Sequence, residues 1–167
     1  MNRITLELTP YVPAADLFRL VCHEPDCAFL DSSLVGELGR WSIIGLKPYE
    51  TFIKENDGSF TRNGQPQPGR SFEDSLQDYL RTHRDENRTG LPMVSGAIGY
   101  LSYDYGRESM RVPSQEADPE PIPQARVVFY DLLVIEDCRE KRVWLSACGV
   151  TQPAQALLDR FREQIAQ

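Results

Sequence analysis

The stretch Arg126-Val-Val-Phe-Tyr-Asp-Leu-Leu-Val-Ile-Glu136 decides the fold, because it is apolar at almost every position. A strand of this composition is normally covered on both of its faces. A second strand is predicted over residues 142–147, and the charged residues 139–142 suit the tip of a hairpin between the two. We therefore expect a hairpin whose first strand has structure packed on both sides.

Periodic patterns on either side of this hairpin predict the other elements. Polar and apolar residues alternate in the expected strand at 4–8, and residues 28–33 and 40–46 are rich in Leu, Ile and Trp. Apolar residues recur every three or four positions in the expected helices. The expected strands are residues 4–8, 28–33, 40–46, 50–55, 60–62 and 94–105. The expected helices begin near Pro13, at the N-cap Ser71 and at the N-cap Thr151. Residues 63–70 and the acidic, proline-rich residues 113–123 are predicted to be loops.

Helices and antiparallel strands thus come in alternating blocks, with little sign of βαβ units. This order predicts the α+β class, in which mainly antiparallel sheets carry helices packed on the outside. The chain has 167 residues, which suits one domain with a core of its own.

Composition excludes several classes of function. The net charge of −7 argues against a nucleic-acid partner, because phosphate binding requires clustered basic residues. No apolar run is long enough for a membrane helix and no signal peptide is evident, so the cytoplasm is the expected compartment. The four cysteines suit neither a disulfide framework nor a zinc site, and no metal site is predicted.

No set of residues predicts a reaction centre, so no catalytic residue is expected. There is no Gly-x-Ser-x-Gly sequence, and neither glycine pair at 36/39 or 96/99 is followed by the lysine of a phosphate loop. Four acids could serve in acid–base chemistry, but they border turns and are interpreted as solvated strand ends. These acids are Asp104, Asp131, Glu136 and Asp137.

A small-ligand site is the stronger hypothesis. Ser32 offers a hydroxyl, Arg40 a forked donor for a carboxylate, and Trp41 a flat apolar wall, the groups that an amino-acid ligand requires. The alternative is that Arg40 pairs with Asp31 or Glu37 and that Trp41 fills the core.

Three blocks carry a family resemblance. They are Phe29–Ser32 with Gly39–Gly45 (FLDS…GRWSIIG), Pro92–Glu108 (PMVSGAIGYLSYDYGRE) and Pro123–Asp131 (PQARVVFYD). Together they resemble the N-terminal domain of two chorismate-utilising enzymes, anthranilate synthase component I and aminodeoxychorismate synthase component I. The second and third blocks are somewhat more similar to the aminodeoxychorismate enzymes.

The resemblance implies that residues 1–167 are a non-catalytic N-terminal domain, half of a layered α/β/β/α sandwich. The other half would be a C-terminal catalytic domain, absent from this sequence, that binds chorismate and Mg²⁺. A glutamine amidotransferase subunit would supply ammonia. On this interpretation the sequence is an excised domain or a truncated product without synthase activity. A stand-alone ligand-binding or interaction module is the alternative from another class.

The resemblance also implies half of a tryptophan pocket. The matching positions are Asp31, Ser32, Leu38, Gly39, Arg40 and Trp41, with Asp31 where the family usually has glutamate. Trp41 replaces a tyrosine or phenylalanine and can itself fill the place of an indole. The other wall would come from the absent domain, so we expect no tight binding of tryptophan by this chain. Apolar strand faces near residues 32–46 or 96–103, uncovered by its absence, are expected to self-associate.

Overall fold

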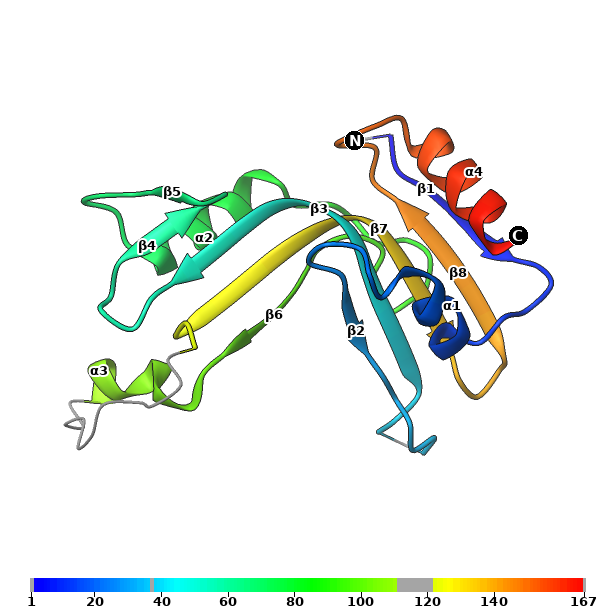
Figure 1. Cartoon of the computed structure of the whole chain (residues 1–167), viewed down its shortest axis with the longest axis horizontal. Coiled ribbons are helices and arrows are strands. Elements are labelled where there is room, and N and C mark those ends of the chain that lie inside the picture. Colours follow the sequence, from blue (N-terminus) through cyan, green and yellow to red (C-terminus); the bar gives the residue numbers. More distant parts are fainter. Residues whose placement is uncertain (1, 37, 111–121, 167) are drawn as a thin grey trace. The chain divides into compact units, whose positions relative to one another are not determined.

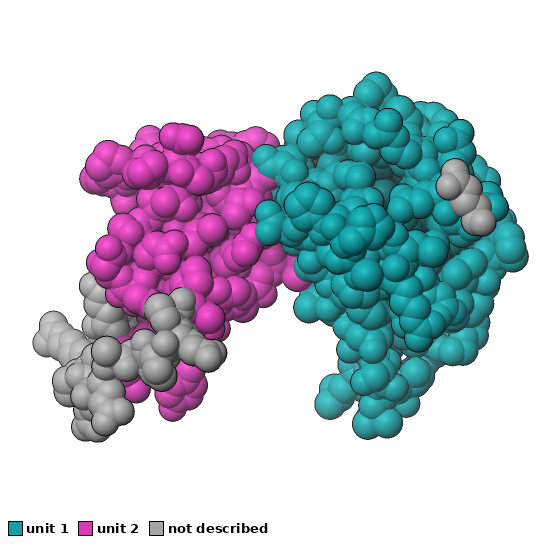
Figure 2. All heavy atoms as spheres, viewed as in Figure 1, with its two compact units in different colours: residues 1–49, 85–97, 129–167 teal, residues 50–84, 98–128 magenta. Residues whose placement is uncertain are grey.

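Two long strands, β3 (Trp41–Lys54) and β7 (Ala125–Asp137), run through most of the structure (Figure 1). The computed structural model describes residues 2–36, 38–110 and 122–166, so most of the expected loop at 113–123 lies outside the described residues. Unit 1 comprises residues 1–49, 85–97 and 129–167, and unit 2 comprises residues 50–84 and 98–128 (Figure 2). Both long strands contribute residues to each unit.

Unit 1 contains the antiparallel strand order β1-β8-β7-β3, with β2 (Ala28–Leu30) also paired to β3. β1 (Ile4–Leu8) pairs with β8 (Arg142–Ala147), which forms the expected hairpin with β7. In this register Leu6 lies opposite Leu145, and Leu145 lies opposite Val134. Alternate residues of neighbouring strands therefore gather on the same face.

Two helices cover one face of this sheet. α1 (Ala14–Val21) and α4 (Ala154–Ile165) lie beside each other over β1 and β8 (Figure 1). Their buried stripes pack on inward-facing strand residues in one hydrophobic cluster. The buried members of the cluster that come from the helices are Ala14, Leu17, Val21, Ala154, Leu157, Leu158 and Phe161.

The expectation that β7 is covered on both faces is confirmed. Leu132 and Val134 belong to the cluster beneath the helices, while Leu133 and Ile135, which point to the opposite face, are also fully buried. On that face the Ser146 hydroxyl donates to the Val94 carbonyl at 2.7 Å, which ties residues 85–97 to the sheet.

Unit 2 is built around aromatic rings. It contains the end of β3, β4 (Phe60–Arg62), β5 (Gln65–Pro66), α2 (Phe72–Thr82) and all but the first residue of β6 (Ala97–Leu101). η1 (Tyr103–Gly106), α3 (Arg107–Met110) and the start of β7 also belong to it. The ring of Phe52 lies 5.9 Å from that of Phe60 and 5.4 Å from that of Tyr79. Phe72 meets Phe60 edge-on at 5.8 Å, a favourable geometry for aromatic pairs.

Helix α2 begins as the sequence predicts. The Asp74 N–H donates to the Ser71 hydroxyl at 3.0 Å, so Ser71 is the N-cap. The α+β class is also confirmed, because antiparallel pairs and peripheral helices make up the structure.

Several predicted boundaries are wrong, and the strand expected at 28–33 ends at Leu30. The separate strands expected at 40–46 and 50–55 form the single strand β3, which passes through Pro48 with Lys47 at a φ of 57°. The strand expected at 94–105 is only Ala97–Leu101, because Gly96 adopts a φ of 134° and a 3-10 turn follows Ser102. The loop expected at 63–70 includes the short strand β5.

The predicted cap of α4 is wrong as well. Its N-cap is Pro153, without a side-chain hydrogen bond, and the hydroxyl of Thr151 donates instead to the carboxylate of Asp131 at 2.6 Å. The hydrogen bond from the Thr151 hydroxyl to a charged carboxylate is stronger than a hydrogen bond between neutral groups at a helix end. The hydroxyl is therefore held by Asp131 and does not cap α4.

Candidate functional site

The candidate loop is residues 31–40, between β2 and β3 in unit 1. At its base the Ser32 hydroxyl donates to the Trp41 carbonyl at 2.7 Å, and the Ser32 N–H donates to the Ser42 hydroxyl at 2.9 Å. Ser42 is fully buried, and its hydroxyl donates to the Asp31 carboxylate at 3.1 Å. The structure thus brings Asp31 and Ser32 together against the first residues of β3.

Arg40 pairs with an acid that the sequence did not suggest. Its Nε and Nη2 donate to Asp137 at 2.9 and 2.5 Å, while Asp31 is engaged by Ser42. Glu37, the other suggested partner, lies outside the described residues. The actual partner is almost 100 positions away in the sequence, and only the pairing of strands brings it close.

Asp137 organises the neighbouring hairpin turn as well. It is 1% exposed and accepts the N–H groups of Arg139 and Glu140 at 3.0 and 3.1 Å. Burial by itself would raise the pKa of Asp137, but the hydrogen bonds from Arg40 and from these two N–H groups outweigh it and hold this pKa below its usual range. The same interaction raises the pKa of Arg40, so the pair stays charged at neutral pH.

Trp41 is half-buried at the start of β3. The Arg40 guanidinium lies 4.8 Å from its ring centre, which is a cation–π distance. Its ring lies 6.3 Å from that of Trp144 on β8, tilted by 51°. Both the arginine and the indole therefore already have partners within unit 1.

The outer part of the loop is tightly turned and apolar. The Gly36 N–H donates to the Gly39 carbonyl at 3.0 Å, and a Cβ on Gly39 would lie 2.2 Å from the Leu34 carbonyl oxygen, so only glycine fits there. The Arg139 guanidinium donates to the Gly36 carbonyl. Leu38 is fully exposed and Leu34 is 85% exposed. Leu38 therefore projects away from the polar base of the loop.

The interpretation of Asp131, Glu136 and Asp137 as solvated strand ends is wrong. Asp131 is fully buried, and its carboxylate accepts the N–H groups of Val150 and Thr151 at 2.9 and 2.6 Å. Glu136 accepts the N–H of Ala14 at 2.9 Å and also bonds the Tyr11 hydroxyl. The sequence did indicate their burial, because they stand in the most apolar predicted strand, where an acid must be paired.

Both segments that are expected to self-associate carry exposed apolar side chains. In residues 32–46 they lie in the loop, on Leu34, Val35 and Leu38. In residues 96–103 they are Tyr100, Leu101 and Tyr103. Exposed apolar groups of this kind often mark contact surfaces.

Metal-binding groups and membrane-spanning helices are both lacking among the described residues. No group of three or more His, Cys, Asp or Glu side chains in this part of the chain could hold a metal ion. No helix within the same residues is long and apolar enough to cross a membrane.

Comparison with known proteins gives component 1 synthases as relatives. No family model matches the chain. Anthranilate synthase component 1 of Thermus thermophilus is 28% identical over 137 residues, covering 82% of this chain and 29% of the relative. Aminodeoxychorismate synthase component 1 of Bacillus subtilis is 30% identical over 116 residues, covering 64% of this chain and 23% of the relative. The homologues of this chain are component 1 synthases of these two kinds. The predicted resemblance is confirmed.

A solved structure has a fold similar to that of this chain. Anthranilate synthase component I from Streptococcus pneumoniae matches with a TM-score of 0.64 and 21% identity, over 80% of this chain and 30% of that one. The chain thus spans less than a third of the length of the Thermus, Bacillus and Streptococcus proteins.

Proposed function

We propose that the chain is the N-terminal, non-catalytic domain of an aminodeoxychorismate synthase component I. The parent enzyme would convert chorismate and glutamine-derived ammonia to 4-amino-4-deoxychorismate, on the route to 4-aminobenzoate and folate in the cytoplasm. The observation that carries this proposal is the coverage: 64% of this chain matches a component 1 relative, but only 23% of that relative is represented.

The second candidate is the N-terminal domain of anthranilate synthase component I. The relatives support it equally, since anthranilate synthase component 1 of Thermus thermophilus matches over 82% of the chain. Our preference for the first candidate comes from the blocks at Pro92–Glu108 and Pro123–Asp131, which are somewhat more similar to the aminodeoxychorismate enzymes.

In the proposed parent enzyme, the reaction takes place outside this domain. A catalytic domain would bind chorismate and Mg²⁺, and a glutamine amidotransferase subunit would deliver ammonia. The described residues offer no set of three metal-ligating side chains, so no step of the reaction is assigned to them. The role of this domain would be structural, and its exposed apolar loop at Leu34 and Leu38 is available for a second domain.

The candidate loop would form half of a tryptophan pocket. Its polar groups are already engaged, the Ser32 hydroxyl by the Trp41 carbonyl and Arg40 by Asp137. An incoming ligand would have to displace these partners and also offset its loss of translational and rotational freedom. We therefore propose that the isolated chain does not bind tryptophan tightly and that Trp41 occupies the place of the ligand's indole.

Product analysis tests the proposal. The reading frame that includes this chain and its downstream sequence would be expressed and supplied with chorismate, Mg²⁺ and ammonium, with the 167-residue chain alone as the control. Formation of 4-amino-4-deoxychorismate, which keeps the pyruvyl group, supports the proposal. Fluorescent anthranilate with release of pyruvate supports the second candidate. Turnover by the 167-residue chain alone would refute both.

A further inference from the structure

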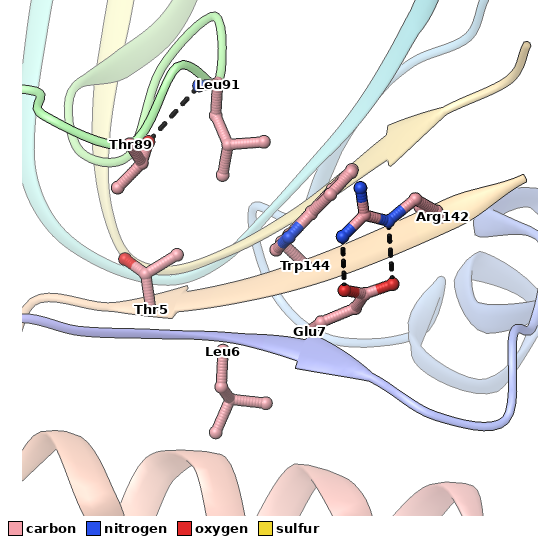
Figure 3. A pocket seen from close by; sticks show the side chains of 7 residues that line it. All are labelled: Thr5, Leu6, Glu7, Thr89, Leu91, Arg142 and Trp144. Carbon is pink, nitrogen blue, oxygen red and sulfur yellow. Dashed lines mark hydrogen bonds and ion pairs between the residues drawn. The ribbon is translucent and has the colours of Figure 1, made fainter. Parts of the chain in front are cut away.

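A cavity of about 330 Å³ opens on the face of unit 1 opposite to helix α4 (Figure 3). Its floor is formed by neighbouring residues of β1 and β8, and Thr89 and Leu91 from the segment 85–97 overhang it. The volume lies within the range of small-molecule sites. The cavity includes none of the six residues predicted to form the tryptophan pocket.

A charged pair forms one wall. The Arg142 Nε and Nη2 donate to the two carboxylate oxygens of Glu7 at 2.8 and 2.6 Å, from adjacent strands. The side chains are 51% and 35% exposed, so water already reaches both partners. An ion pair in such a position contributes little to folding, and a ligand can open it at low cost.

An aromatic and apolar surface lies beside the pair. The Arg142 guanidinium lies 4.8 Å from the centre of the Trp144 ring, and Leu91 is almost fully buried. The nearby hydroxyls have internal partners: Thr5 bonds Ser146 at 2.9 Å, and Thr89 donates to Asn87 at 2.7 Å. The available recognition groups are therefore one cation, one anion and an indole wall.

The balance of charge selects the class of ligand. A simple anion that binds Arg142 would leave Glu7 without its partner, and a simple cation that binds Glu7 would do the same to Arg142. A molecule with both an ammonium and a carboxylate satisfies the two at once and leaves the net charge of the site unchanged. Its planar or apolar body would then pack on Trp144.

We propose that this cavity is a binding site for a small zwitterion with an apolar or aromatic side group, of the size of an apolar α-amino acid. The carboxylate lies against Arg142, the ammonium against Glu7 and the side group against Trp144 and Leu91. This site is independent of the proposed function, because none of its lining residues belongs to the predicted tryptophan pocket.

Titration of the 167-residue chain with matched probes tests the site. The probes are L-phenylalanine, 3-phenylpropionate, which lacks the ammonium, and 2-phenylethylamine, which lacks the carboxylate. NMR follows the two indole N–H signals, which the Trp41→Phe variant assigns. L-phenylalanine should shift the Trp144 signal with a dissociation constant of the order of 1 mM, as expected for a ligand of about a dozen heavy atoms. Each singly charged probe should bind at least about tenfold more weakly.

Variants locate the binding. Arg142→Leu and Glu7→Gln should each weaken L-phenylalanine binding about tenfold or more, and Arg142→Lys should fall between Arg142→Leu and the parent chain. Glu24→Gln is the matched control, since it removes the Lys47–Glu24 ion pair of the same unit without altering the cavity lining. Equal binding of the three probes, no Trp144 shift at 20-fold above the expected constant, or equal losses in Glu24→Gln and Glu7→Gln would overturn the proposal.

Discussion

Replacement of Asp131 with asparagine tests whether a buried acid in β7 holds the segment that leads into helix α4. The Oδ1 atom of Asp131 accepts the Val150 N–H at 2.9 Å, and Oδ2 accepts the N–H and the hydroxyl of Thr151, each at 2.6 Å. The residue is fully buried. Asparagine has the same shape but only one acceptor oxygen, so its NH₂ group must face one of these donors.

The expected loss follows from the three hydrogen bonds. If the amide oxygen takes the place of Oδ2, the Val150 N–H loses its acceptor, at a cost of about 1–3 kcal/mol. The two bonds from Thr151 lose their charge assistance, at about 1 kcal/mol each, while the smaller desolvation of a neutral amide offsets part of the total. We expect the free energy of unfolding to fall by about 2–4 kcal/mol, which lowers the melting temperature by about 5–15 °C.

Tryptophan fluorescence during urea unfolding measures this change in the right part of the chain. Both tryptophans, Trp41 and Trp144, lie in unit 1 together with Asp131. Asp159→Asn on the exposed surface of α4 is the matched control, with an expected change within about 0.5 kcal/mol. A loss in Asp131→Asn no larger than in this control would refute the view that the carboxylate holds the segment.

Three further outcomes are expected. Because the pKa of Asp137 is held below its usual range, the ionised carboxylate stabilises the fold fully above the unfolded-state pKa of about 3.9. This stabilisation is lost as the pH falls through the lower folded-state pKa. Urea unfolding between pH 2 and 6 should show the loss, and the free energy of unfolding of Asp137→Asn should depend less on pH over this range. Ser71→Ala removes the N-cap of α2 and should cost about 1 kcal/mol, visible as faster amide hydrogen exchange in α2; unchanged exchange would contradict the cap. Gly45→Ala places a Cβ 2.6 Å from the buried Tyr130 ring and should cost about 1–3 kcal/mol in thermal unfolding, whereas an unchanged melting temperature would show that the ring can move aside.

Local patterns in the sequence were sufficient to predict the type and approximate position of most helices and strands. Alternation identified β1, three- and four-residue spacing identified the helices, and Ser71 was recognisable as a cap from its own neighbours. The continuous apolar run in β7 predicted coverage of both faces, because an apolar face exposed to water is unfavourable wherever it lies in the fold. The six positions of the predicted tryptophan pocket were recognisable through family motifs, and their role in binding stays a prediction.

The sequence by itself therefore determined the element types, the α+β class and the kinship with component 1 synthases, since these depend on side-chain periodicity and on local motifs. Only the tertiary structure decided the partners of the charged groups. Arg40 finds Asp137, and Arg142 finds Glu7 135 positions away, because strand pairing joins residues whose separation along the chain carries no local signal. Packing likewise gave the buried Asp131 its donors, the Val150 N–H and the N–H and hydroxyl of Thr151, because these groups lie 19 and 20 positions further along the chain.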